Sequence, residues 1–294
     1  MQDPQFVGMS LFPISLFGMA LNWCVTVILI REKTTLSSFM ILTLVKSFFD
    51  AIYLTVYFLY ITPMIIFASQ LMIYCSHWAG YVLIVCYEIS IHTHFLSSVN
   101  RFIAVFFPFS YKNIFSPCAT KIYITAIAIF SFTMMTTVIF GFGCRLEYRP
   151  ETWVSFYDVT ITICAWYAYY VDFLKNLVVV FTDAIIDIIT LLKIQKMRKQ
   201  YRNGKRSENY TKKETDFLKQ TLGQALCYLM CYTSYLMVPE MMSNRYVAFF
   251  MSLVSWAMIA MIDGLLTIVY NADIKRRVVK PKEISVTTVV PTKK

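Results

Sequence analysis

Residues 75 to 117 read CSHWAGYVLIVCYEISIHTHFLSSVNRFIAVFFPFSYKNIFSP. The first part is mostly apolar and is long enough to cross a lipid bilayer, which takes about 20 helical residues at roughly 1.5 Å each. The run ends at Asn100-Arg101-Phe102, and a segment that contains Pro108 follows. The stretch therefore predicts a membrane-spanning helix with an arginine at its foot and a proline-containing loop after it.

The composition extends this prediction to the whole chain. Hydrophobic residues make up 58% of the 294 residues, charged residues make up 15%, and the mean hydropathy is +0.58. These values lie outside the balance of a soluble domain. We expect an all-α bundle of seven transmembrane helices, at about residues 6 to 30, 39 to 61, 76 to 107, 120 to 143, 168 to 192, 217 to 238 and 246 to 270.

The distribution of positive charge orients this bundle. Of the 27 Lys and Arg residues, 22 fall in the loops and tail on one side, and three fall on the other. Positive charge stays in the cytoplasm, so the N-terminus is expected outside and the C-terminus inside. The expected organisation is a receptor domain at 1 to 278 and a short cytoplasmic tail at 279 to 294. The basic loop at 193 to 219 is an orientation signal attracted to anionic lipid, and nucleic acid is not an expected partner.

The run NRFIAVFFPFSYKNIFS resembles the nematode serpentine chemoreceptors, in particular the Srx family. Most of the wider superfamily of G-protein-coupled receptors has Asp/Glu-Arg-Tyr where this chain has Asn-Arg-Phe. The segment DIITLLKIQ fits the Srx pattern, as does Asp263-Gly264 followed by Tyr270-Asn271. The departure from Asn/Asp-Pro-x-x-Tyr in the last helix puts the usual activation switch of that helix in doubt.

The resemblance implies a chemosensory receptor in the plasma membrane, on the sensory cilia of nematode neurons. It implies a small-molecule ligand in the outer helix bundle and a heterotrimeric G protein as partner. The expected coupling and activation residues are Asn100, Arg101, Phe102, Pro108 and Lys112.

The resemblance also implies a disulfide between Cys75, at the outer start of the third helix, and Cys144 in the second outer loop. Cys164 lies near enough to the outer face to compete for this pairing. Cys227 and Cys231 are one helical turn apart without further ligands nearby, so they indicate packing and no metal site is expected.

Ionisable residues at membrane depth normally face the bundle interior and have partners. By resemblance, Asn22, Asp50 and Asp263 form a polar cluster, to which Lys46 adds the positive charge that a bound cation would otherwise supply. Two alternatives stay open: Lys46 reaches the cytoplasmic interface, and Asn22 bonds only a neighbouring backbone.

The candidate ligand pocket combines the third, fifth and seventh expected helices. Buried Glu88 is either protonated or paired, and Lys175 and an amine-bearing ligand are its two candidate partners. Asp172 and Lys175 are also spaced to pair with each other. The aromatic residues around position 170 either line the pocket or form an interfacial belt. The expected pocket residues are Leu83, Tyr87, Glu88, Tyr170, Asp172, Lys175 and Trp256.

Other classes of membrane protein fit less well. A retinal protein needs a lysine in the last helix, which 246 to 270 lacks, so no cofactor is expected. No nucleophile elbow, HExxH or P-loop motif is present, which argues against an enzyme. A seven-helix transporter of a small solute is the alternative function, although the sequence shows no related triple-helix halves.

Overall fold

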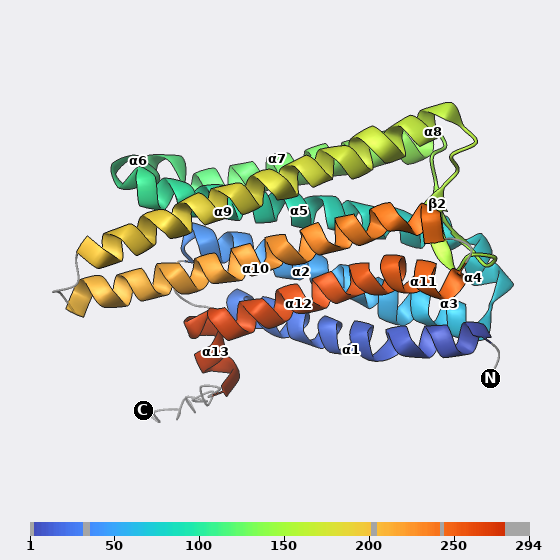
Figure 1. Ribbon diagram of the computed structural model, residues 1–294, viewed down its shortest axis with the longest axis horizontal. Helices are drawn as coiled ribbons and strands as arrows, with labels where there is room; N and C mark the ends of the chain where they lie inside the picture. Colours follow the sequence, from blue (N-terminus) through green and yellow to red (C-terminus); the bar gives the residue numbers. More distant parts are fainter. Residues whose placement is uncertain (1–2, 32–35, 201–204, 242–243, 280–294) are drawn as a thin grey trace, which may run out of the picture.

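The computed structural model describes residues 3–31, 36–200, 205–241 and 244–279. Within these ranges most residues are helical, and the long helices run side by side in one elongated bundle (Figure 1). The prediction of an all-α, seven-helix bundle is confirmed, because a long helical segment covers each of the seven expected ranges to within a few residues. Most of the expected tail, residues 280–294, lies outside the described residues.

Seven long segments make up the described bundle, some with a π-helical turn (η) inside them. The first four are α1 (Asp3–Ile30); α2 (Ser38–Val56) with η1 (Tyr57–Ile61) and α3 (Thr62–Phe67); α5 (Ser76–Phe106); and α7 (Pro117–Thr136) with η2 (Thr137–Gly141). The other three are α8 (Thr162–Trp166) with η3 (Tyr167–Leu174) and α9 (Lys175–Gln200); α10 (Lys205–Met241); and α11 (Arg245–Phe249) with η4 (Phe250–Val254) and α12 (Ser255–Tyr270).

Shorter elements lie at the two ends of the bundle. They are α4 (Gln70–Tyr74), α6 (Pro108–Ile114), α13 (Ala272–Val279) and an antiparallel hairpin of β1 (Leu146–Arg149) and β2 (Val154–Tyr157). The hairpin lies at the same end as the start of α1, and α6 and α13 lie at the opposite end (Figure 1). We call these the hairpin end and the α6 end.

Local sequence explains where several helices begin. The Ser116 hydroxyl accepts a hydrogen bond of 3.2 Å from the backbone N–H of Ala119, and Pro117 takes the first helical position of α7, where no N–H is needed. Ser37 caps α2 in the same way, with Met40 as the donor. The segments α9 and α10 run beyond the expected 192 and 217, because the Lys, Gln, Arg and Glu residues there favour helix in water as well.

The surface and interior have the polarity of a membrane protein. Large apolar side chains face outward along the helices, among them Phe17, Ile122, Phe130, Val178, Phe181 and Met230. Polar side chains are buried instead, among them Asn22, Glu88, Asn100, Asn176, Asp187 and Asn271, each without exposed surface. This arrangement suits a hydrocarbon solvent, in which only the bundle interior offers polar partners.

Five described segments are long and apolar enough to span a membrane by length and composition alone: Gln5–Ile30, Ser38–Phe67, Ser76–Phe106, Pro117–Gly141 and Arg245–Tyr270. Segments α9 and α10 carry more charged residues. In α9 these include Asp183 and Asp187, which are buried against neighbouring helices.

Helix α5 runs through the middle of the bundle. It packs against α2, α7, α9 and α10. Helix α1 packs against both α2 and α12. The residues of α5 therefore reach every level of the interior, from the hairpin end to the α6 end.

Candidate functional site

A cavity of about 120 Å³ lies at the hairpin end of the bundle. Its walls come from α2 and η1, α5, the hairpin, η3, α10 and the η4–α12 segment. Among the described residues, Asp172 is the one charged side chain in this lining. The ring-bearing residues of the wall include Tyr53, Tyr57, Tyr87, Tyr157, Tyr232 and Trp256.

The β1–β2 hairpin forms the side of the cavity away from the bundle core. Leu146 and Tyr157, which face each other in the strand register, both line the cavity. The backbone N–H of Tyr148 donates to the hydroxyl of Ser76 on α5 at 3.1 Å. Gly80, one turn along α5, lies against the carbonyl of Leu146 so closely that a Cβ atom would displace the strand.

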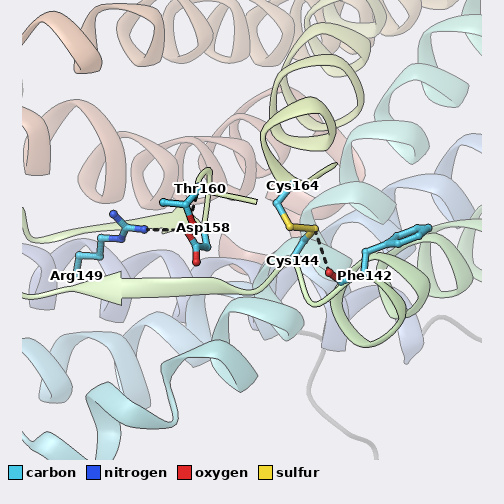
Figure 2. Close-up of a disulfide and its surroundings, with 6 residues drawn as sticks. All are labelled: Phe142, Cys144, Arg149, Asp158, Thr160 and Cys164. Carbon is cyan, nitrogen blue, oxygen red and sulfur yellow. Dashed lines mark hydrogen bonds and ion pairs between the residues drawn. A yellow bond between two sulfur atoms is a disulfide. The ribbon is translucent and has the colours of Figure 1, made fainter. Parts of the chain in front are cut away.

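A disulfide between Cys144 and Cys164 closes the base of this hairpin, with the two Cα atoms 5.2 Å apart (Figure 2). The expected pairing of Cys75 with Cys144 is therefore wrong, and Cys75 carries a free thiol. The physical reason is the hairpin itself. Antiparallel pairing of β1 with β2 returns the chain to its starting point, which brings the residues flanking the strands together, and Cys144 forms one disulfide only.

Figure 2 also shows a polar turn just after β2. The carboxylate of Asp158 accepts hydrogen bonds from the Thr160 hydroxyl at 2.7 Å and the Thr160 backbone N–H at 3.1 Å. The Arg149 guanidinium lies 4.0 Å away. The Thr160 hydrogen bonds, together with the Arg149 charge, lower the pKa of Asp158.

Glu88, on α5 just below the cavity, is completely buried and has several partners. The Lys175 ammonium lies 2.5 Å and the Asn176 amide 2.7 Å from its carboxylate oxygens, and the His92 ring lies 3.5 Å away. Of the two partners considered for Lys175, the structure brings Glu88 to it. An ion pair between Asp172 and Lys175 is not among those of the described residues, since η3 ends between them and its wider turns change the angle between their side chains.

The other predicted pocket residues separate into two groups. Leu83, Tyr87, Asp172 and Trp256 line the cavity. Tyr170 does not: its side chain is 50% exposed and its ring contacts those of Trp166 and Tyr169, which are similarly exposed. This position is typical of an interfacial aromatic belt.

Aromatic rings connect the cavity to the polar interior beneath it. The Tyr87 and Tyr232 hydroxyls contact each other, and the Trp256 ring packs edge-on against both rings, with centroids 5.0 and 5.3 Å away. The Tyr228 ring lies below, 6.5 Å from that of Tyr87.

The structure brings Lys46, Asp50 and Asp263 into direct contact in the middle of the bundle. The buried Lys46 ammonium is 3.1 Å from the Asp50 carboxylate and also forms an ion pair with Asp263. The Ser90 hydroxyl donates to Asp50 at 2.7 Å, and the Tyr228 hydroxyl donates to Asp263 at 3.2 Å. Lys46 does not reach the cytoplasmic interface, because its side chain is only 7% exposed.

Asn22, the fourth residue of the predicted cluster, has a different set of partners. Its amide donates to the backbone carbonyls of Ala260, at 2.9 Å, and Gly18, at 3.0 Å. Gly264 allows this approach, since a Cβ there would meet the Asn22 side chain. Asn22 therefore joins α1 to α12 through the backbone, which is the alternative that the sequence left open.

Arg101, at the foot of α5, is buried between two other helices. Its guanidinium lies 3.7 Å from the ring centroid of Phe39 on α2 and 4.6 Å from that of Phe217 on α10. The remaining predicted coupling residues lie on the end of α5 and on α6. Asn100 donates to the Tyr111 hydroxyl at 3.4 Å, Phe102 stacks on Phe106, Pro108 begins α6, and Lys112 lies in the last turn of α6.

The structure adds residues that the sequence analysis did not assign. His94 on α5 lies 3.0 Å from the carboxylate of Asp183 on α9, and both are buried. A signal for this pair was present, because Asp183 at membrane depth requires a partner. The aromatic partners of Arg101 and the hairpin residues of the cavity wall had no such signal, because they depend on tertiary packing.

Comparison with known proteins identifies the family. The model of the family "Serpentine type 7TM GPCR chemoreceptor Srx" matches residues 12–271. "Serpentine receptor class X 45" of Caenorhabditis elegans is 25% identical over 292 residues, covering 92% of this chain and 80% of that protein. The crystal structure of squid rhodopsin matches with a TM-score of 0.72 at 15% identity, over 94% of this chain and 84% of that chain, which shows a common fold.

The family match spans six of the seven long helices in full and most of α1, and it includes the buried core, the foot of α5 and the cavity described above. The chain belongs to the Srx family of serpentine, seven-transmembrane G-protein-coupled chemoreceptors.

Proposed function

We propose that this receptor binds a small molecule in the cavity at the hairpin end and activates a heterotrimeric G protein at the α6 end. In this proposal the hairpin end faces outward from the plasma membrane of a sensory cilium, and α6, α13 and the basic ends of α9 and α10 face the cytoplasm. The positive-charge distribution supports this orientation. The cavity, with ring-bearing walls and one charged group, supports a small-molecule ligand.

The observation that carries the proposal is that α5 makes contacts at three levels of the bundle. Tyr87 lines the cavity, and Arg101 is packed between α2 and α10. Between them, Ser90 donates to Asp50, which forms an ion cluster with Lys46 and Asp263. Helix α12 contributes to both of these places as well, because Trp256 lines the cavity and Asp263 belongs to the ion cluster. Helices α5 and α12 thus each touch both the ligand cavity and the charged interior.

The ligand acts because it binds one state of the receptor more tightly than the other. It shifts the receptor toward a state in which the helix ends around Arg101 separate, and the shift is limited by how much more tightly that state binds the ligand. A separation of α10 from α5 removes the contact between Phe217 and Arg101 and opens a cleft for the G protein.

The test is G-protein dissociation, measured with a proximity sensor in cells that express this chain and are exposed to a panel of volatile and water-soluble compounds. An active compound is expected to lose its effect in Leu83→Trp, which fills the cavity, and in Arg101→Ala, which removes the side chain that the opened cleft offers to the G protein. Leu71→Trp is the matched control, since Leu71 is 74% exposed on α4 and lies outside the cavity lining. Surface expression of every variant is measured alongside.

A transporter gives a different pattern. Uptake of a panel compound that depends on this chain, without G-protein dissociation from the unmodified protein at normal surface expression, contradicts the receptor proposal.

A further inference from the structure

We propose that the ligand of the hairpin-end cavity is a small amine in its cationic form, and that its ammonium group pairs with Asp172. The inference rests on the proposed function only in taking this cavity as the ligand site. Three observations support it: the charge balance of the cavity, the rings in its wall and its volume.

The charge balance singles out Asp172. Of the two carboxylates at this level, Glu88 lies behind the wall and is neutralised by Lys175, with a further hydrogen bond from Asn176. Asp172 is in the wall itself, and the ion pairs of the described residues include none to its carboxylate. The Tyr157 hydroxyl donates a hydrogen bond to it, and the charged neighbours of its carboxyl group are Glu88 and Lys175. Since Lys175 is paired with Glu88, Asp172 is the carboxyl group of the cavity wall that has no cation partner among the described residues.

A charge in such surroundings favours a ligand of opposite sign. A carboxylate away from bulk water is costly unless a cation or several donors approach it. The lysine of this level is already held by Glu88, with the Lys175 side chain 25% exposed. A ligand ammonium that enters the cavity supplies the cation that the Tyr157 hydrogen bond does not provide, whereas an anionic ligand meets repulsion from Asp172.

The rings of the wall recognise the same kind of group. Tyr87, Tyr157, Phe173 and Trp256 line the cavity together with Asp172. Aromatic faces attract ammonium groups, and the attraction grows when water is excluded. The hydrocarbon part of an amine also packs on these rings, so both parts of the ligand find complementary surface.

The cavity volume sets an upper size. A cavity of about 120 Å³ is slightly smaller than an engineered protein cavity of about 150 Å³ that holds benzene. A ligand that fits without rearrangement therefore has roughly five to seven non-hydrogen atoms. Aliphatic amines of this size are volatile as free bases and are protonated at neutral pH.

The test compares three molecules of matched shape: 3-methylbutylamine, 3-methylbutan-1-ol and 3-methylbutanoate. Binding to the purified, detergent-solubilised receptor is measured as the rise in unfolding temperature with concentration, up to about 10 mM. We expect the amine to bind at least about tenfold more tightly than the alcohol, and the carboxylate to bind least. This comparison uses the unmodified chain, so it stands even where a variant does not fold.

Variants then test the named residue. Asp172→Asn is expected to weaken amine binding roughly 30-fold or more, and Asp172→Glu to retain it within about tenfold. Glu147→Gln is the matched control: it removes one acidic group from the exposed face of β1 at the same end of the bundle, and amine binding is expected to be unchanged.

Three results overturn the inference: alcohol binding at least as tight as amine binding, amine binding in Asp172→Asn within about threefold of the unmodified receptor, or no amine binding at the highest concentration. The readout involves no G protein. A neutral compound that binds and drives G-protein dissociation thus rejects the amine while the receptor proposal stands.

Discussion

The guanidinium of Arg101 lies 3.7 Å from the centroid of the Phe39 ring, and Phe217 on α10 flanks it on another side. The two rings themselves lie close together, with centroids 4.6 Å apart. Through these side chains the foot of α5 is fixed to α2 and α10 at the α6 end. A cation packed against two adjacent aromatic rings is held by the charge distribution of the rings as well as by packing.

Loss of one ring should loosen this contact. We expect Phe217→Ala to raise basal G-protein dissociation by roughly two- to tenfold, because the contact is worth about 0.5 to 2 kcal/mol and favours the closed arrangement of α5 and α10. Phe109→Ala is the control, since Phe109 is 97% exposed at the same end. Equal basal signals from the two variants, at equal surface expression, contradict this role of the contact.

Removal of Lys46 should destabilise the receptor. Lys46→Met leaves the Asp50 and Asp263 carboxylates buried without their cation, which costs about 3 to 5 kcal/mol in comparable buried pairs. We expect reduced surface expression and a lower unfolding temperature of purified protein. The double variant Lys46→Met, Asp263→Asn should recover part of the loss. Unchanged expression and signalling in Lys46→Met reject the idea that this lysine replaces a bound cation.

The two cysteine pairings make opposite predictions. Cys144→Ser and Cys164→Ser should each lower stability by about 3 kcal/mol, the value for closing a loop of this length, while Cys75→Ser should have no effect on the disulfide. Mass spectrometry of unreduced peptides identifies the linked residues directly. A peptide that joins Cys75 to Cys144 contradicts the structure.

The lowered pKa of Asp158 should be visible when the pH is varied. Since the Thr160 hydrogen bonds lower the folded pKa of Asp158, the charged form is favoured in the folded hairpin, and its contribution to stability is complete above the unfolded pKa of about 4. The contribution is lost as pH falls through the lower, folded value. The carboxyl carbon chemical shift of Asp158 is expected to titrate below pH 4, and Thr160→Val should move its midpoint upward.

Much of the fold follows from local sequence. The apolar run that ends at Arg101 predicts α5, and Ser116-Pro117 marks the start of α7. The ion pair of Lys46 with Asp50 reflects a spacing of one helical turn, which sequence alone reveals. These features depend on residues that are neighbours along one helix.

Features that depend on packing between elements are harder to predict from the sequence. Lys175 was assigned two possible partners, and only the position of α5 beside α9 decides for Glu88. The partner of Cys144 follows from a hairpin of two four-residue strands, and an alternation of apolar and polar residues over so few positions is a weak signal for a strand. The rings around Arg101 come from α2 and α10, which are remote in sequence, so no local pattern indicates them.

The hairpin has a further consequence for how such receptors diverge. It supplies Leu146, Val154, Ser155 and Tyr157 to the cavity wall and is a separate element from the long helices against which it packs. Substitutions in Val154 or Ser155 change the shape and polarity of the cavity without altering contacts between long helices. On the proposed function, such substitutions change ligand preference while the contacts between the long helices stay in place.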